Sequence, residues 1–70
     1  MHKYEIILYW SDEDACWVAE VPQLEVCAAH GDTAEEALAN IAEATDLWID
    51  SARIEGTPIP EPKGRKLDFA

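Results

Sequence analysis

Three consecutive acidic residues, Asp12, Glu13 and Asp14, form the densest group of potentially reactive side chains in the sequence. A metal-dependent nuclease would need several carboxylates that reach one divalent ion from separate elements, which neighbours in a single loop do not provide. The ordinary interpretation of such a run is a solvated loop. Because Trp10 and Trp17 flank it, the functional alternative is a loop that presents acids and aromatic rings to a basic protein.

The histidines and cysteines do not form a catalytic pattern. His2 is close to the amino end and His30 precedes a predicted helix, and neither is spaced from a Cys or Ser as in a nucleophile pair or a metal knuckle. A turn near Pro22 would keep Cys16 and Cys27 beyond the roughly 4–7 Å between Cα atoms that a disulfide tolerates, which favours two free thiols. We therefore expect a protein that is not an enzyme, with no catalytic residue, no bound metal and no cofactor.

The length and composition predict a single small folded domain. The chain has 70 residues, and its hydrophobic fraction of 49% is too high for a disordered chain. A core of this size gives a modest margin of stability. We therefore expect self-association into a homodimer or tetramer, or a tightly bound partner.

The negative charge is concentrated in the body of the domain. Residues 1–62 hold fourteen acidic and two basic side chains, a net charge of −12, and the other three basic side chains lie in the last eight positions. Phosphate binding needs clustered Lys and Arg, so the charge argues against nucleic acid as the main ligand and favours a basic protein partner. The sequence has no apolar run of transmembrane length and no secretion leader, which predicts a cytoplasmic protein without membrane contact.

Three short segments have the composition of β-strands. Residues 3–10 are rich in β-branched and aromatic types that alternate with period two. A second strand near residues 15–21 ends at Pro22, and residues 24–29 make a third. The connections are short enough for an antiparallel meander.

The first of these strands is apolar on both faces. One face carries Tyr4, Ile6, Leu8 and Trp10. The other carries Glu5, Ile7 and Tyr9, which together are too apolar for a face that meets only water. We expect another chain to cover part of it.

A long amphipathic helix follows the strands. Thr33 and Glu36 have the spacing of a capping box, in which each side chain accepts the other residue's backbone N–H, and Gly56 supplies a helix stop. The predicted buried stripe is Ala34, Ala37, Leu38, Ile41, Ala42, Thr45, Trp48, Ile49 and Ala52. On this stripe Trp48 is a core residue whose indole N–H needs an acceptor. Leu47 and Ile54 lie off the stripe and are candidates for contacts outside the monomer.

The carboxyl-terminal part is predicted to be extended. Alternate prolines keep residues 57–62 out of the α region and lead the chain back over the domain. Residues 65–69 alternate weakly and are consistent with an edge strand in a short basic tail, 63–70. The basic residues of this tail are predicted to guard an exposed strand edge against further pairing, and the alternative is a contact with nucleic acid. The fold class is therefore α+β, a three-stranded antiparallel sheet packed on one helix in the order β-β-β-α-β, with residues 1–62 as the domain.

Four sequence segments in this order resemble the HicB-type antitoxin family: Trp17–Pro22, Cys27, Gly31–Leu38 and Ile59–Pro62. The resemblance covers roughly residues 3–62. It implies a fold like a truncated ribonuclease H domain. It also implies that the chain binds and neutralises a HicA-like toxin, a small ribonuclease that cleaves messenger RNA, by occluding it.

The chain departs from the family pattern in two places. The family usually has Gly before the Cys, where this chain has Val26, so we expect the tight turn there to relax into ordinary strand. Many full HicB proteins also carry a carboxyl-terminal DNA-binding module. Only eight residues follow Pro62, so we expect no DNA binding by this chain alone.

The candidate partner-binding residues combine exposed aromatic, aliphatic and acidic types. They are Tyr9, Trp10, Asp12, Glu13, Asp14, Trp17 and Leu47. The sequence does not separate a toxin surface from a surface for self-association. The alternative function is a solitary regulatory or ligand-binding module of the same fold without a toxin.

Overall fold

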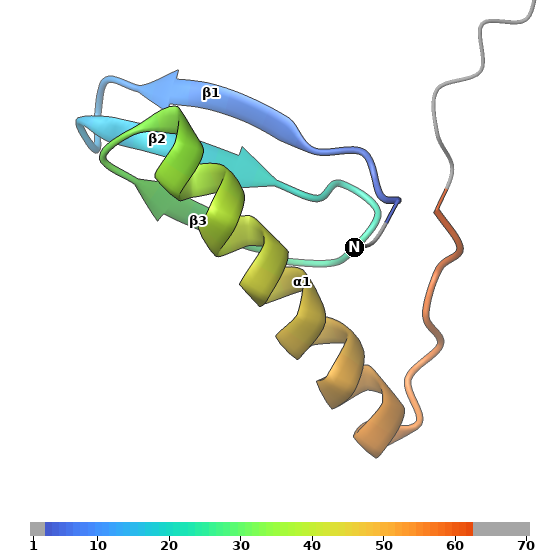
Figure 1. Ribbon diagram of the computed structural model, residues 1–70. Helices are drawn as coiled ribbons and strands as arrows, with labels where there is room; N and C mark the ends of the chain where they lie inside the picture. Colours follow the sequence, from blue (N-terminus) through green and yellow to red (C-terminus); the bar gives the residue numbers. More distant parts are fainter. Residues whose placement is uncertain (1–2, 63–70) are drawn as a thin grey trace, which may run out of the picture.

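The structure is a computed structural model that describes residues 3–62. They form β1 (Ile7–Ser11), β2 (Cys16–Glu20), β3 (Ala28–Gly31) and α1 (Ala34–Glu55). The strands make one antiparallel sheet in the order β1-β2-β3, and α1 crosses one of its faces (Figure 1). The predicted α+β class and three-stranded antiparallel sheet on one helix are confirmed. The predicted edge strand at 65–69 and the basic tail lie outside the described residues.

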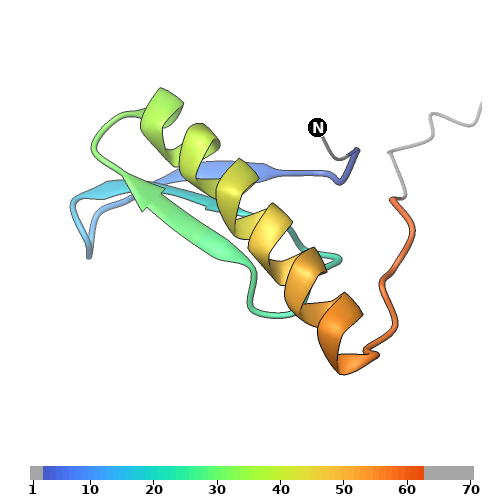
Figure 2. The ribbon, with the colours of Figure 1, turned by 60° about the horizontal axis from the view of Figure 1, so that its bottom comes forward.

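The register of the sheet separates a helix-facing side from an open side. Leu8 pairs with Ala19 and Trp10 with Trp17, and Leu8, Ala19 and Trp17 all belong to or pack on the core beneath α1. The intervening Tyr9 therefore projects from the opposite face, where it lies across from Val18. Figure 2 shows no described element over that face. Its coverage by another chain stays a prediction.

The first strand is shorter than its apolar pattern suggested. The predicted range was 3–10, whereas β1 begins at Ile7. Tyr4 is buried although it lies outside the strand, and its hydroxyl donates a hydrogen bond to the Pro60 carbonyl. The apolar alternation over residues 3–10 therefore marked side chains that enter the core, and only some of these residues form a strand.

The third strand is present, but its predicted bounds of 24–29 were wrong, because β3 begins at Ala28 and residues 24–27 belong to a compact loop before it. The N–H of Val21 donates to the Cys27 carbonyl at 3.0 Å, and the Leu24 N–H donates to the Val21 carbonyl at 3.1 Å. Val26 has a φ of 57°, in the left-handed region, so the expected relaxation into strand does not occur. The tight turn is kept with valine in a position that suits glycine.

The helix begins and ends where the sequence predicted. Thr33 Oγ1 accepts the Glu36 N–H at 3.1 Å, and the Glu36 carboxylate accepts the N–H of Asp32 at 3.1 Å. The second bond of the capping box thus goes to the residue before the cap and not to Thr33. Gly56 ends the helix with a φ of 74°, and its N–H donates to the Ala52 carbonyl.

The core lies between α1, the inner face of the sheet and the loop before β3. Its buried residues are Tyr4, Ala19, Val21, Leu24, Cys27, Ala37, Ile41 and Ile49. The buried Thr45 hydroxyl donates to the Ile41 carbonyl at 2.7 Å, so it adds no unsatisfied polar group. The predicted helical stripe is buried along its centre, whereas Leu38 and Ala42 at its edge are exposed.

Residues 57–62 run back along the domain as predicted. Beside the contact between Tyr4 and Pro60, the Gln23 side chain donates to the Glu61 carbonyl at 2.8 Å, and Ile59 packs against the core. Figure 1 shows this segment passing from the end of α1 towards the start of the chain. It therefore ties the two ends of the described chain together.

Replacing Val26 with glycine is expected to stabilise the free protein, although valine-to-glycine changes usually destabilise. Left-handed backbone costs an L-residue about 1–2 kcal/mol, and the extra freedom of glycine in the unfolded chain offsets about 0.5–1 kcal/mol of that relief. Val26 is 97% exposed, so no burial is lost. Urea denaturation should give a higher unfolding free energy for Val26→Gly and little gain for Val26→Ala, which keeps its Cβ. A loss of stability in Val26→Gly would contradict the expectation.

Candidate protein-binding surfaces

Two tryptophans, one in β1 and one in β2, contact each other beside the turn that joins these strands. The rings of Trp10 and Trp17 are 5.8 Å apart between centroids and meet edge to face at 74°. The Trp10 indole N–H donates to Asp12 Oδ1 at 2.9 Å. Part of the aromatic surface predicted for a partner is therefore used to hold the turn in shape.

The acidic residues of the same turn are exposed. Asp12, Glu13 and Asp14 lie at the surface, and Ser11 and Asp14 are joined by hydrogen bonds at 3.2 and 3.3 Å. Within residues 3–62 no three His, Cys, Asp or Glu side chains are grouped to hold a metal ion. Both cysteines are free thiols.

Tyr9 belongs to the same strand but to the opposite face from Trp10. Its hydroxyl donates to the Glu20 carboxylate at 3.0 Å. That hydrogen bond to Glu20, together with partial desolvation and the nearby negative charges, raises the pKa of Tyr9 above its ordinary value of 10.0. One flat partner surface therefore does not contact both Tyr9 and Trp10.

Leu47 lies away from the other six candidate residues. β3 ends at Gly31, opposite Trp17, and α1 starts near that end of the sheet. Leu47 comes thirteen positions after Ala34, which is about 20 Å along a helix that rises 1.5 Å per residue. The predicted set thus divides between a hairpin end and a distant part of α1.

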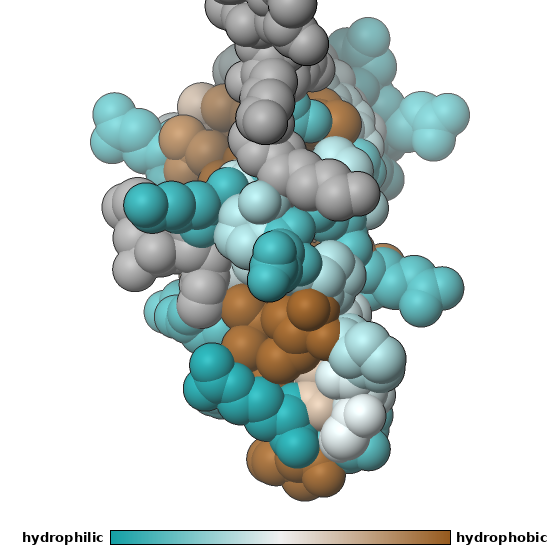
Figure 3. Space-filling model, turned by 90° about the vertical axis from the view of Figure 1, so that its right-hand side faces the viewer, coloured by the Kyte–Doolittle hydropathy of each residue, from teal (hydrophilic) through white to brown (hydrophobic). Residues whose placement is uncertain are grey.

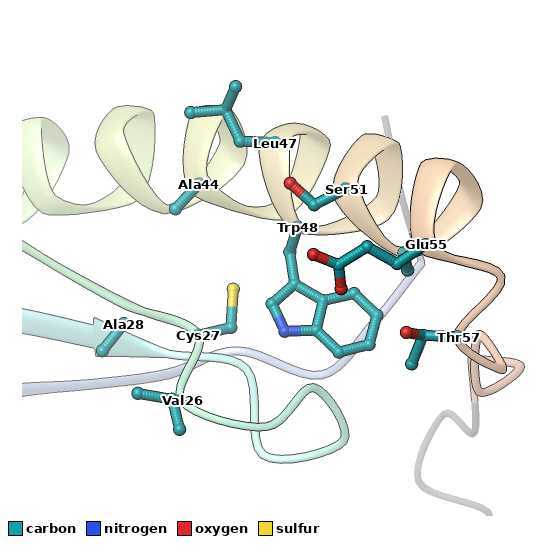
Figure 4. A pocket seen from close by; sticks show the side chains of 10 residues that line it. Val26, Cys27, Ala28, Ala44, Leu47, Trp48, Ser51, Glu55 and Thr57 are labelled. Atoms are coloured by element: carbon teal, nitrogen blue, oxygen red, sulfur yellow. The ribbon is translucent and has the colours of Figure 1, made fainter.

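A groove of about 410 Å³ lies beside Leu47, between the second half of α1 and the loop before β3. One wall is formed by Val26 and Cys27 of the loop with Ala28 at the start of β3. Trp48 and Ala52 form the other wall, and Leu47 and Glu55 also line the groove. Figure 4 shows the Trp48 ring directed from the helix towards the loop, with the Cys27 thiol beside it. We call this feature the Trp48 groove.

Trp48 has a structural and a surface role at once. It packs against the core, as predicted, and its indole N–H donates to the Glu25 carbonyl at 2.9 Å, which supplies the expected acceptor. The remainder of the half-buried ring faces the groove. Sequence reasoning missed the groove; its one sequence signal was Val26, an apolar residue where the turn favours glycine.

The described surface carries a large uncompensated negative charge. Residues 3–62 contain fourteen carboxylates and two basic side chains, so at least twelve carboxylates have no cation of their own within this part of the chain. Such repulsion destabilises the compact state and is screened by salt. A membrane-spanning helix is absent from residues 3–62.

Raising NaCl from about 10 mM to about 500 mM is expected to stabilise the protein by ~1 kcal/mol, which is roughly 4–8 °C in the unfolding midpoint of a domain this size. Thermal unfolding followed by circular dichroism measures the shift. Asp50 is exposed on α1, and Asp50→Lys lowers the net negative charge by two. This variant should show a smaller salt response, and an equal or larger one would contradict the repulsion argument.

Comparison with known proteins places the chain in a family. Residues 4–68 match the family described as HicB-like antitoxin of bacterial toxin–antitoxin system. The chain is 38% identical over 58 residues to the UPF0150 protein ssr1258 of Synechocystis sp., an alignment that covers 81% of this chain and 84% of that protein. It is 37% identical over 65 residues to the UPF0150 protein Ta0767 of Thermoplasma acidophilum, with 93% of each chain covered.

No solved structure gives a significant match, so the likeness to ribonuclease H stays a prediction. The family match reaches through every described element and includes the loop before β3 and the proline-rich segment. The chain belongs to the HicB-like antitoxin family of bacterial toxin–antitoxin systems.

Proposed function

We propose that this protein binds and neutralises a HicA-like toxin, a basic ribonuclease that cleaves messenger RNA, by occluding its RNA-binding surface. The observation that carries the proposal is the charge of the described domain, with fourteen carboxylates against two basic side chains. A protein that binds RNA presents Lys and Arg to phosphates. An acidic surface steers towards such a protein and competes for the same cations.

The surface also has the apolar groups that a protein interface needs. Figure 3 shows apolar patches set between hydrophilic side chains on one side of the molecule. Exposed large apolar residues include Ile7, Tyr9, Trp10 and Leu47. The charges then orient the two proteins and speed their association, and the apolar contacts slow the dissociation of the complex. We propose the hairpin residues Trp10, Asp12, Glu13 and Asp14 as the part that attracts the toxin, with no catalytic step by the antitoxin itself.

Co-expression with the product of a neighbouring short, basic reading frame tests the proposal. The two proteins should copurify, cells that express the toxin should recover growth, and the toxin should stop cleaving RNA in the complex. Association should weaken as salt is raised, because the steering charges are screened. Failure to copurify, together with failure to restore growth, would exclude the antitoxin role and favour a solitary regulatory module.

A change at the hairpin tests how the acids contribute. Replacing Asp12, Glu13 and Asp14 together by their amides should slow association about tenfold with little change in dissociation, as expected for charges at the rim of an interface. The matched control removes three exposed carboxylates that lie away from the hairpin, by Glu43→Gln, Asp50→Asn and Glu61→Gln. Stopped-flow mixing with toxin measures both rates. Equal slowing in both variants would mean that total charge, and not the hairpin, governs the encounter.

A further inference from the structure

We propose that the Trp48 groove is the docking site for an apolar side chain of the toxin, and that a basic residue of the toxin lies beside that side chain against Glu25 and Glu55. This inference rests on the proposed function and assigns its main contact surface. The hairpin end lies about 20 Å away along α1. It then speeds the association of the two proteins but does not hold the toxin in the complex.

The first support is a valine that the fold does not explain. Val26 has a left-handed φ of 57°, a rare conformation for a β-branched residue, and its side chain is 97% exposed. It contributes nothing to the core and adds strain to the turn. Strained residues of this kind cluster at functional sites, where the rest of the structure holds them in place. An exposed valine on the wall of a groove is explained if a partner covers it.

The second support is the preformed shape of the groove. The indole N–H of Trp48 is already bonded to the Glu25 carbonyl at 2.9 Å, so the ring stands in a fixed position before anything binds. Cys27 and Ala52, which also line the groove, are buried, and Leu47, 68% exposed, adds a further apolar side chain to the lining. A rigid tryptophan surrounded by small and aliphatic groups is typical of the pocket that receives an interface anchor.

Charge decides between the toxin and a second copy of this chain. Glu55 lines the groove, and Glu20 and Glu25 line the adjoining depression on the other side of Val26. None of the residues that line these two hollows is basic. Two copies that meet here would bring like charges together, whereas a basic protein would neutralise them. The groove therefore favours the toxin as its occupant.

The hairpin aromatics are weaker anchor candidates for a structural reason. Trp10 and Trp17 already contact each other, and the Trp10 indole N–H is bonded to Asp12. A partner would gain less from covering groups that are already partly desolvated and paired. Val26 and Leu47 have most of their apolar surface still in water.

Two of the three tryptophans, Trp10 and Trp48, provide separate reporters for the test. In ¹⁵N-labelled protein the indole N–H of Trp48 reports the groove and that of Trp10 reports the hairpin, because each is bonded within its own surface. The probe is the toxin from the neighbouring reading frame, separated from the co-expressed complex and refolded. Binding should shift the Trp48 signal strongly and the Trp10 signal weakly. The opposite pattern would overturn the groove assignment while leaving the antitoxin role in place.

Two variants test the anchor itself. Val26→Gly and Leu47→Ser should each weaken toxin binding about tenfold, as removal of a contact at the centre of an interface does. Val26→Gly should do so while the free protein becomes more stable, a combination that a purely structural residue would not give. The control is Ile54→Ser, on the same helix, 86% exposed and outside the groove, which should leave affinity within about twofold. Equal losses in Leu47→Ser and Ile54→Ser would overturn the inference.

A second probe separates failure of the groove from failure of the proposed function. If the toxin does not bind the wild-type protein, a helical peptide of leucine and lysine in seven-residue repeats is added instead, with a leucine–glutamate peptide of the same pattern as control. A Trp48 shift with the lysine peptide alone supports a site for basic amphipathic segments, even though the antitoxin role has failed. If neither the toxin nor the lysine peptide shifts Trp48, the groove is not a docking site.

Discussion

Replacing Gly31 with alanine is expected to destabilise the protein by about 3 kcal/mol, because the helix approaches the end of β3 too closely for a side chain. A Cβ at this position would stand 2.7 Å from Glu36 Cβ and 2.8 Å from the Glu36 carbonyl carbon, and it would also meet the Ala37 backbone nitrogen. These atoms belong to the first turn of α1. They move only if the helix moves away from the sheet.

The other described glycine provides the matched control. Gly56 has a φ of 74° but nothing within 4 Å of a built Cβ, so Gly56→Ala should cost only the left-handed backbone penalty, about 1 kcal/mol. Urea denaturation of both variants measures the difference. Equal losses of unfolding free energy in the two variants would show that small shifts relieve the close approach at Gly31. The helix would then be packed less tightly on the sheet than its caps and contacts indicate.

The close approach at Gly31 also bears on binding. The same junction holds Trp17 in register opposite Gly31 and starts the helix that carries the Trp48 groove further along. A displaced helix start should disturb the hairpin end before it disturbs the groove. Toxin association by Gly31→Ala should therefore slow more than its dissociation accelerates, provided that the variant is folded.

The helix was predictable because its signals are local. The Thr33 side chain, the acids of the first turn and Gly56 each act on backbone within a few residues, so sequence order alone identifies the helix. Its caps did not depend on the sheet. The error in the predicted caps was the target of the Glu36 carboxylate, which is set by the path of the chain before Thr33.

The strand limits were less predictable because apolar alternation reports burial and not backbone pairing. Tyr4, Leu24 and Cys27 are all buried core residues, yet none lies in a strand. A loop that inserts side chains into a core has the same sequence pattern as a short strand. The left-handed turn at Val26 could not be read locally, because valine itself disfavours it.

The candidate site was predictable in its chemistry and not in its layout. Acidic and aromatic types indicated a basic partner, but only the register puts Tyr9 and Trp10 on opposite faces. The Trp48 groove depends on a loop conformation that the sequence disfavours. Trp48 was correctly predicted as a core residue. That the exposed side of its ring lines a groove depends on the path of residues 24–28, which the sequence did not predict.

Replacing Ile41 with alanine is expected to cost about 3–4 kcal/mol, since truncating a buried isoleucine loses its transfer free energy and leaves a cavity. Ile41 is 0% exposed at the centre of the core. The total free energy of unfolding of a domain of this size is roughly 3–9 kcal/mol, so the variant should be close to unfolding at 37 °C. Ile54→Ala, the same substitution on the same helix at a residue 86% exposed, should change stability by less than about 0.5 kcal/mol.

The toxin should restore much of the stability that Ile41→Ala removes, because a ligand that binds only the folded state stabilises that state by mass action. At a free toxin concentration of about 100 times Kd the gain is roughly 2.7 kcal/mol, close to the expected loss. The unfolding midpoint of Ile41→Ala should therefore rise steeply with added toxin, while an equally basic protein that does not bind RNA leaves it unchanged. If toxin gives no such rise although it copurifies with the wild type, then it also binds the unfolded chain, and the interface does not require the folded groove.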